Sequence, residues 1–464
     1  MKSRLVPPVR SRVLNQGRML AYAVKPSWFR VVLSLVFLVS CVSWGGESTP
    51  SREHHSYGNA NAFPSTPQVR SLSALAQIVY ELKQDVAAKD LGSIHNEDAI
   101  LSICLKPMMQ RLDVVAYAQR DQFKSDLATF AHHVSNLHLA GDAGQQAQAE
   151  TELDRVVESF DRVKSHFPEW TVTAALKSTN RFTCPMHPDI VGNRTNFCPK
   201  CGMELNQLKR ILPPDSEIDS LQPVVRASIR TKSLLVPGKV CSAVLRLERA
   251  NGDPILPADL IETHTQKIHL LVVDESLNDY HHEHPVPTVV PGEYAFTFTP
   301  RKPGRYRAWA DLRPYPLGLQ EYAMADMAAA TTPEPLRDRE IRLTTTVDGL
   351  KYDLVLMRDD LRAGEPSTAK LRITTMDGKP FTRLEPIMAT FAHLVAFNED
   401  YQTVLHMHPK GLVVSDPNAR GGPELEFQIY SMKPGFYRLF AQVQIDGRSR
   451  FAPFGIQFLQ GSKE

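Results

Sequence analysis

Between residues 71 and 167, apolar side chains recur at steps of three and four positions, which is the period of one face of an α-helix. The clearest runs cover 72–86, 123–137 and 153–163. Three breaks divide the pattern into four segments; they lie at 90–92, 113–118 and 141–144. Four helices with short connections predict an antiparallel four-helix bundle over 71–170.

From residue 224 onward the helical period is lost. Short alternating or continuous apolar runs follow, such as 243–247, 268–273 and 294–298, and Gly and Pro punctuate them every 8 to 15 residues. This spacing predicts an all-β sandwich architecture.

The β half also repeats itself. His269-Leu-Leu-Val-Val matches His393-Leu-Val-Ala-Phe, and the later His-x-His-Pro sequences match at the same offset of 124 residues. Pro-Gly-x-Tyr follows in each half, at 303–306 and 434–437. Collinear matches of this kind predict two copies of one domain, at 224–340 and 341–464.

Between the two halves lie two close ligand pairs, Cys184 with His187 and Cys198 with Cys201. Each pair spans one tight turn, so four donors can converge on one ion. The surrounding segment has few large apolar residues, and a structural Zn²⁺ site contributes about 10 to 16 kcal/mol to folding. A disulfide between Cys198 and Cys201 is the competing interpretation, but it gives Cys184 and His187 no role.

This cysteine knuckle (180–206) resembles the small heavy-metal-binding domain of copper-transporting P-type ATPases and of copper and silver efflux adaptors. The resemblance rests on Phe-Thr-Cys-Pro-Met-His-Pro and Cys-Pro-Lys-Cys-Gly-Met. It implies that the four donors bind a soft metal, with Met186 and Met203 as thioethers suited to Cu(I).

Each β copy carries a histidine and, after twelve intervening residues, a His-x-His-Pro sequence. Alternate residues of a strand share a face, so a hairpin can bring three imidazoles to one edge. The two predicted trios are His269, His282 and His284, and His393, His406 and His408. Three imidazoles suit Cu(II) or Zn²⁺. Alternatively, these side chains are edge histidines that bond a loop; His264 is a further ligand candidate, with Met388 as its counterpart.

The His-Leu-x-Val, His-x-His-Pro and Pro-Gly-x-Tyr pattern also resembles immunoglobulin-like modules found beside heavy-metal-binding domains in exported bacterial proteins. The predicted fold class is therefore multidomain α + β, with a four-helix bundle, a small metal knuckle and two tandem immunoglobulin-like β-sandwich repeats. A linker at 207–223 joins the knuckle to the sandwiches.

The helical region contains further histidines, methionines and one cysteine; they are His95, Cys104, Met108, Met109, His132, His133 and His138. One interpretation is a second copper site, but at helical spacing such side chains are more often core or solvated positions, and the sequence favours that interpretation. Cys104 and Cys241 could pair or stay buried separately.

Seven Lys and Arg side chains within residues 2–30 precede an apolar run at 31–42, which is too short to span a bilayer. This pattern predicts an export signal over 1–46, followed by a polar tether at 47–70. Leu38-Val-Ser-Cys41 resembles a bacterial lipobox, which would make Cys41 the lipidated first residue. Cleavage by an ordinary signal peptidase within 40–46 is the alternative.

A net charge of +2 over 464 residues argues against nucleic-acid binding, and no phosphate-binding loop or nucleophile motif indicates an enzyme. The sequence therefore predicts an exported copper-, silver- or zinc-binding protein that buffers or delivers metal, or confers resistance, with an envelope metal-efflux system as its candidate partner. The alternative is an envelope adhesion or scaffold protein whose zinc knuckle is purely structural.

Overall fold

The computed structural model describes residues 67–461 with gaps at 111, 113–114, 180–181, 184–190, 193–196, 203–204, 208–223, 328–336 and 412. The predicted export signal, with Cys41, and nearly all of the predicted tether and linker lie outside the described residues. The described residues all belong to one compact unit, Asn59–Glu464. No helix in the described part of the chain combines the length and the apolar content that a membrane span needs.

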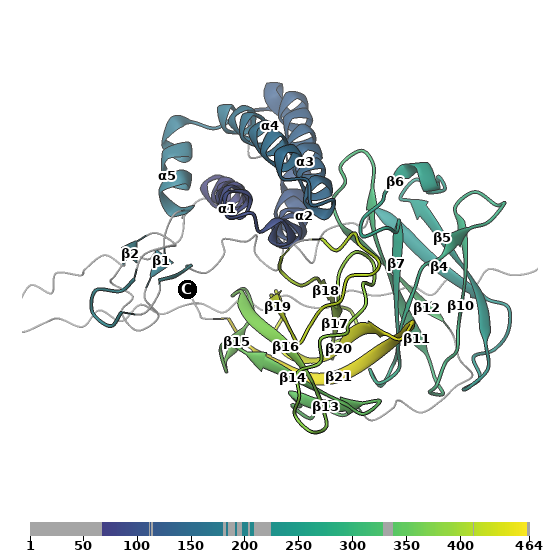
Figure 1. The fold of residues 1–464 in the computed structure, drawn as a ribbon. Coiled ribbons are helices and arrows are strands. Elements are labelled where there is room, and N and C mark those ends of the chain that lie inside the picture. Colours follow the sequence, from purple (N-terminus) through teal and green to yellow (C-terminus); the bar gives the residue numbers. More distant parts are fainter. Residues whose placement is uncertain are drawn as a thin grey trace, which may run out of the picture. The chain divides into compact units, whose positions relative to one another are not determined.

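The N-terminal part is helical, as its period predicts (Figure 1). The helices are α1 (Pro67–Ala88), α2 (Ile94–Gln110), α3 (Arg120–Asp142), α4 (Gln146–Ser165) and α5 (Glu169–Thr179), with single turns η1 (Leu91–Ser93) and η3 (Tyr117–Gln119). Helix α1 packs against α2, α4 and α5, and α3 packs against α2 and α4. The apolar faces meet in one core that includes Leu72, Phe123 and Phe130.

The structure corrects the predicted helix count, because the described residues contain five α-helices rather than four. Helix α1 begins at Pro67, inside the range predicted as tether. The fifth helix starts directly after Pro168, whose carbonyl accepts a hydrogen bond from the backbone N–H of Thr171 at 2.9 Å. Proline fits this position because it lacks the N–H that the first turn of a helix leaves unpaired.

Around the cysteine motif, three two-residue strands form an antiparallel sheet in the order β2-β1-β3. They are β1 (Phe182–Thr183), β2 (Val191–Gly192) and β3 (Asn206–Gln207). Cys198 and Leu205 are buried together, and Tyr80 of α1 packs against them.

The first β domain is a sandwich of two sheets, ordered β4-β5-β10-β9 and β12-β11-β7-β8, with β6 paired to β11. The strands are β4 (Val225–Thr231), β5 (Cys241–Arg249), β6 (Leu260–Ile261), β7 (Ile268–Asp274), β8 (Tyr280–Glu283), β9 (Val286–Pro287), β10 (Glu293–Phe298), β11 (Tyr306–Pro314) and β12 (Glu321–Met327); the turn η4 (Pro257–Asp259) precedes β6. Leu245 and Phe296 from one sheet and Leu270 and Ala308 from the other share its core.

The second β domain has sheets ordered β13-β14-β16-β19 and β15-β21-β20-β17-β18. The strands are β13 (Thr344–Val347), β14 (Leu350–Leu356), β15 (Leu361–Arg362), β16 (Ser367–Thr375), β17 (His393–Asn398), β18 (Val404–Met407), β19 (Glu424–Ile429), β20 (Gly435–Ile445) and β21 (Arg448–Leu459). Its β21-β20-β17-β18 order corresponds to β12-β11-β7-β8 of the first domain.

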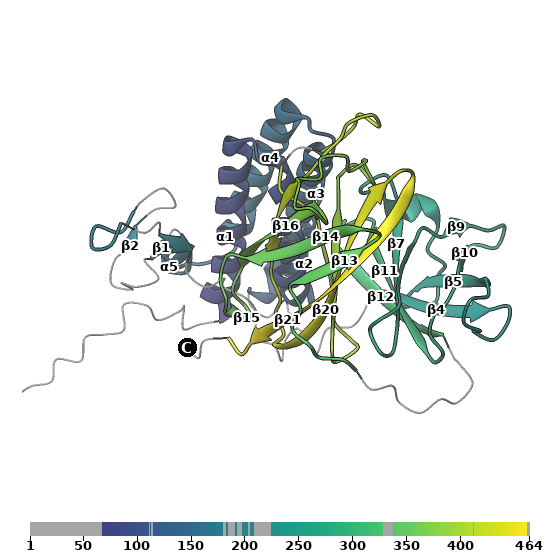
Figure 2. The ribbon, with the colours of Figure 1, turned by 60° about the horizontal axis from the view of Figure 1, so that its bottom comes forward.

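The two sandwiches pack against each other through a separate apolar cluster. Leu271 and Trp309 of the first domain meet Val395, Phe397 and Phe440 of the second. In both views β11 and β20 lie side by side (Figures 1 and 2). Strands β7 and β17 are therefore buried on both faces, which explains why they read as continuous apolar runs rather than alternating ones.

The helices also contact the first sandwich. Leu319 is part of the helical core, and the backbone N–H of Gln320 donates a hydrogen bond to Ser102 Oγ of α2 at 2.9 Å. Lys106 Nζ of α2 donates to the carbonyl of Gln320 at 2.9 Å and lies 3.0 Å from Glu321 Oε1. These contacts hold α2 against the first sandwich.

Candidate metal centres

The structure brings together the first predicted trio, His269, His282 and His284. His269 lies on β7 and His282 on β8, while His284 directly follows β8. One ring nitrogen from each of the three lies within 4.8 Å of the others. His269 Nδ1 is 3.2 Å from His282 Nε2.

The second trio, His393, His406 and His408, has the same arrangement on β17 and β18. Its ring nitrogens again lie within 4.8 Å of one another, and His393 Nδ1 is 3.2 Å from His406 Nε2. All three side chains are buried.

The hydrogen bonds of each trio fix which ring nitrogens face each other. His269 Nε2 donates to the carbonyl of Thr263 at 3.1 Å, and His282 Nδ1 donates to Gln442 Oε1 at 2.8 Å. A neutral imidazole has only one N–H. The two nitrogens that face each other at 3.2 Å therefore both carry lone pairs, which repel unless a cation lies between them.

The second trio repeats this feature. His393 Nε2 donates to the carbonyl of Ile387 at 3.2 Å, and His406 Nδ1 donates to Asp311 Oδ2 at 2.9 Å. His393 Nδ1 and His406 Nε2 are thus also facing lone pairs when both rings are neutral. Both trios have the donor chemistry that a divalent metal ion requires.

The partners of His282 and His406 belong to the opposite sandwiches, so each trio depends on a residue of the other domain. Gln442 lies on β20 and Asp311 on β11. The ring centroid of His406 lies 5.4 Å from that of His282 and 5.5 Å from that of His269. The sheets that carry the two trios pack against each other, so the trios lie next to each other rather than in separate parts of the molecule.

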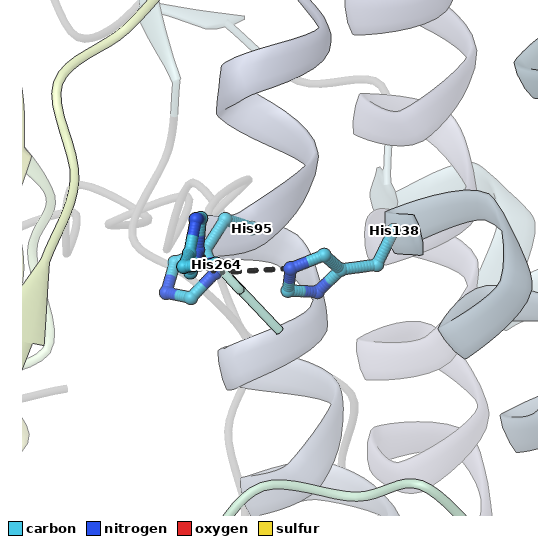
Figure 3. A group of neighbouring side chains, drawn as sticks. All are labelled: His95, His138 and His264. Atoms are coloured by element: carbon cyan, nitrogen blue, oxygen red, sulfur yellow. Dashed lines mark hydrogen bonds between the residues drawn. The ribbon is translucent and has the colours of Figure 1, made fainter. Parts of the chain in front are cut away.

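A third group, the helix-side trio, consists of His95 on α2, His138 on α3 and His264 from the loop before β7 (Figure 3). His95 Nδ1 lies 3.2 Å from His138 Nε2 and 3.5 Å from His264 Nε2. All three side chains are buried. His95 and His138 are buried positions of their helices, as predicted, but nothing in the sequence indicated that they face each other and His264.

The helix-side trio adjoins the second trio. The ring of His264 stacks on that of His408 with centroids 3.9 Å apart, and the rings of His95 and His408 meet edge to face at 4.2 Å. Nine of the sixteen histidines thus form one cluster where the helices and both sandwiches meet. His264 belongs to the helix-side trio, rather than completing the first trio.

Burial keeps most of these imidazoles neutral. It lowers the pKa of His269 to about 3 and those of His264 and His284 to about 4, with neighbouring histidines adding to the effect. The same causes hold the pKa values of four others well below the ordinary range; these are His95, His282, His393 and His408. Neutral imidazole is the form that binds metal.

His138 differs from the other histidines in its ionisation. Burial alone would lower its pKa, but the carboxylates of Asp142 and Asp98 raise it to about 9. His138 Nδ1 donates to Asp98 Oδ2 at 2.6 Å, and Asp98 is also ion-paired with Arg313. A metal ion that binds His138 Nε2 must displace a proton from that atom.

Several buried ring nitrogens of the cluster make no hydrogen bond within the described part of the chain. They are His95 Nε2, His284 Nε2 and both ring nitrogens of His408. A buried polar atom without a partner costs about 1 to 3 kcal/mol. Coordination of a metal ion would give a partner to the unpaired ring nitrogen of His284 and to one of the two unpaired ring nitrogens of His408.

Part of the cysteine knuckle is described. Cys198 is buried and Cys201 is exposed, and the backbone N–H of Gly202 donates to the carbonyl of Cys198 at 2.7 Å, closing the turn. Gly202 has a φ of +72°, a conformation that glycine adopts without strain. The other predicted ligands lie outside the described residues; they are Cys184, Met186, His187 and Met203.

A family model described as "Heavy metal binding domain" matches residues 181–207. Residues 181–207 are a heavy-metal-binding domain. In addition, 90 residues of the chain are 36% identical to a copper-transporting P-type ATPase of Rhizobium leguminosarum bv. viciae. This match covers 18% of the chain and only 10% of the ATPase. The heavy-metal-binding domain is thus established, as its motif predicted, whereas the ATPase's transport activity does not carry over.

The β half matches a second family, described as "Domain of unknown function (DUF8832)", over residues 224–323 and 345–459. Solved structures similar to the chain include InvD of Yersinia pseudotuberculosis, with 11% identity, a TM-score of 0.16, and coverage of 51% of this chain and 58% of that one. The D00-D0 domain of intimin has 10% identity and a TM-score of 0.14, over 50% of this chain and 99% of that one. These low scores carry no argument about function.

The remaining candidates of the helical region lie apart from the cluster. His132 is exposed, and His133 Nδ1 lies 3.6 Å from Glu152 Oε2. Cys104 is buried in the helical core, whereas Cys241 is buried in the core of the first sandwich, so they do not pair with each other. The signal that could have revealed His95 and His138 is their position on the apolar faces of α2 and α3, where a histidine needs a partner.

Proposed function

We propose that this chain is an exported heavy-metal-binding protein of the bacterial envelope, which buffers or delivers copper or silver and so contributes to resistance. The observation that carries this proposal is the heavy-metal-binding domain at 181–207, with its paired cysteines. Thiolate and thioether donors select soft monovalent ions such as Cu(I) and Ag(I). Zinc is a further candidate for the same ligands.

The two predicted trios give the same chain a second kind of site. Imidazole suits Cu(II) and Zn²⁺, and the facing lone pairs of His269 with His282 and of His393 with His406 provide the ligand atoms. We infer that the protein holds metal in both a soft thiolate site and a buried imidazole cluster. It binds metal rather than catalysing a reaction.

The basic N-terminus and the apolar run at 31–42 support export, and Leu38-Val-Ser-Cys41 supports a lipid anchor on Cys41. A protein held at the envelope by several acyl chains stays bound to the membrane. There it could pass metal to an efflux system, the partner that we propose.

The test is the metal content of the wild-type chain, purified from the exported fraction of a bacterial host grown with copper. We expect bound copper, of which one equivalent is Cu(I) and is lost in Cys198→Ser. Cys241→Ser, which removes a buried cysteine of the first sandwich, is the matched control and should keep that equivalent. Unchanged Cu(I) content in Cys198→Ser, or zinc alone in the exported wild type, would contradict the copper assignment.

A further inference from the structure

We propose that His95, His138 and His264, together with Asp142, form a third metal site, which binds Zn²⁺ or Cu²⁺ and joins the helices to the first sandwich. This inference adds a site to the proposed function without depending on the cysteine ligands. The three histidines come from α2, α3 and the loop before β7 (Figure 3), and Asp142 is the last residue of α3.

The distances within this group match a tetrahedral site. Metal–nitrogen bonds of 2.0 to 2.1 Å place tetrahedral ligand atoms about 3.3 Å apart. His95 Nδ1 lies 3.2 Å from His138 Nε2 and 3.5 Å from His264 Nε2. Asp142 Oδ2 lies 3.2 Å from His138 Nε2, and Asp142 Oδ1 lies 3.8 Å from His264 Nε2. The ligand atoms are therefore already close to their coordinated separations.

The surroundings orient His138 for coordination. His138 Nδ1 donates to Asp98 Oδ2 at 2.6 Å, which directs Nε2 towards the other two histidines. Asp98 is held by Arg313, whose guanidinium also donates to the carbonyl of Gly318 at 3.0 Å. A carboxylate behind a ligating histidine is the usual arrangement in protein metal sites, because it fixes the tautomer and strengthens the ligand.

Asp142 provides an independent observation. Its buried Oδ2 atom accepts no well-aligned hydrogen bond among the described residues, and its ion-pair partner, His138 Nε2, lies 3.2 Å away. A proton on His138 Nε2 would satisfy this contact imperfectly, whereas an ion between the two atoms would satisfy both lone pairs. The carboxylate also supplies negative charge to a site whose other ligands are neutral.

The location of the site defines its effect. His264 has a φ of +48° in a tight turn closed by reciprocal backbone hydrogen bonds between Thr263 and Gln266 at 2.9 and 3.0 Å. His95 and His138 are fixed on two packed helices. An ion held by all three would cross-link segments that are distant in the sequence, so binding should protect α2 and α3 from opening.

The experiment uses the full chain carrying Cys198→Ser and Cys201→Ser, so that the thiolate site does not contribute. His264→Asn removes one ligand, and asparagine tolerates the left-handed backbone of this turn. Thr265→Asn is the matched control, since Thr265 is exposed and has a φ of +67° in the same turn. The probe is Zn²⁺ in a chelator-buffered titration, with bound metal counted by mass spectrometry.

We expect His264→Asn to bind one Zn²⁺ fewer than the Thr265→Asn control, and to lose the zinc-dependent slowing of amide hydrogen exchange in α2 and α3. Asp142→Asn should keep the fold and weaken the same equivalent at least tenfold. Circular dichroism of the metal-free variants checks folding. Equal zinc stoichiometry in His264→Asn and Thr265→Asn would overturn the third site, whatever the cysteine variants show.

If His264→Asn fails to fold, Asp142→Asn decides alone, because retention of every zinc equivalent at wild-type affinity would also overturn the proposal. Failure of the proposed copper function would appear differently, as zinc or no metal at the thiolate site of the wild type. The two ideas are therefore tested by separate measurements.

Discussion

The first and second trios have the same histidine spacing, lie on corresponding strands and bond corresponding backbone carbonyls. They differ in the residue that accepts a hydrogen bond from the middle histidine. His406 Nδ1 donates to the carboxylate of Asp311, whereas His282 Nδ1 donates to the amide oxygen of Gln442. Asp311 pairs in register with His269 on its own sheet, and Gln442 pairs with His393. Corresponding positions therefore carry an acid in one sandwich and an amide in the other.

This difference gives the two trios unequal electrostatics. A carboxylate that accepts a hydrogen bond from an imidazole makes that imidazole a stronger metal ligand. An amide oxygen in the same position does so much less. Burial would raise the pKa of Asp311, but its hydrogen bond with His406 lowers it, so the carboxylate stays charged. Because each partner comes from the opposite sandwich, the acid of the first domain serves the ligands of the second.

The largest expected effect comes from removing the middle histidine of each trio. His406→Ala leaves the charged Asp311 buried without its main partner, and we expect the metal-free protein to lose about 3 to 5 kcal/mol of unfolding free energy. His282→Ala leaves only the neutral Gln442 unpaired, for a loss of about 1 to 3 kcal/mol. Urea unfolding of both variants in chelator measures the difference. Equal losses would show that Asp311 does not distinguish the trios.

A smaller effect should follow from exchanging the partners. Asp311→Asn should weaken divalent metal binding at the second trio by about 10- to 100-fold, as loss of a supporting carboxylate typically does. Gln442→Glu should strengthen binding at the first trio. Competition titrations of each variant against a chelator measure both changes, and Gln444→Glu on the same strand serves as the control. Tighter binding in Gln444→Glu as well would indicate a general charge effect.

A change of one pH unit should have a smaller effect than the substitutions above, and it separates His138 from the trios. Burial lowers the pKa of His269 to about 3 and that of His284 to about 4. As pH falls from 6.5 towards these values, each of the two residues therefore reduces the unfolding free energy of the protein by about 1.4 kcal/mol per pH unit. His138 has a raised pKa of about 9, so its contribution is complete below pH 6.5 and declines as pH rises to 9.

Unfolding of the metal-free protein across this range should therefore show a stability maximum near pH 6.5. His138→Gln should remove the decline between pH 6.5 and 9 while leaving the acid side unchanged. His132→Gln, at an exposed position of the same helix, is the control. A His138→Gln profile that still falls between pH 6.5 and 9 as steeply as the wild type would contradict the raised pKa.

Local patterns predicted the elements and part of the candidate site. Features that depend on neighbouring residues can be read directly from the sequence. They include the period of the helical region, the breaks near residues 90 and 143, and the buried strand at 268–273. The members of each trio could be grouped because His-x-His and the preceding histidine lie on one hairpin. The heavy-metal-binding domain was recognisable because its ligand spacing is itself local.

The joining of the three trios could not be predicted, because contacts between distant segments create it. Trp309 and Phe440 bury the outer faces of two sheets against each other, and no periodicity within either domain reveals this contact. His95 and His138 occupy apolar positions of their helices. The helical period shows that such a position is buried, but it does not show whether a histidine there packs in the core or faces other histidines. Only the position of His264 in three dimensions shows what they face.

The reciprocal bonds from His282 to Gln442 and from His406 to Asp311 bear on how the protein is made. A nascent chain leaves the ribosome N-terminus first, so α2 with His95 emerges before the first sandwich, whereas His408 and Gln442 emerge after it. The imidazole cluster cannot be complete while the second sandwich is still being translated. A metal ion encountered before then meets only part of its ligand set, so full occupancy of the cluster marks a chain whose synthesis and docking are finished.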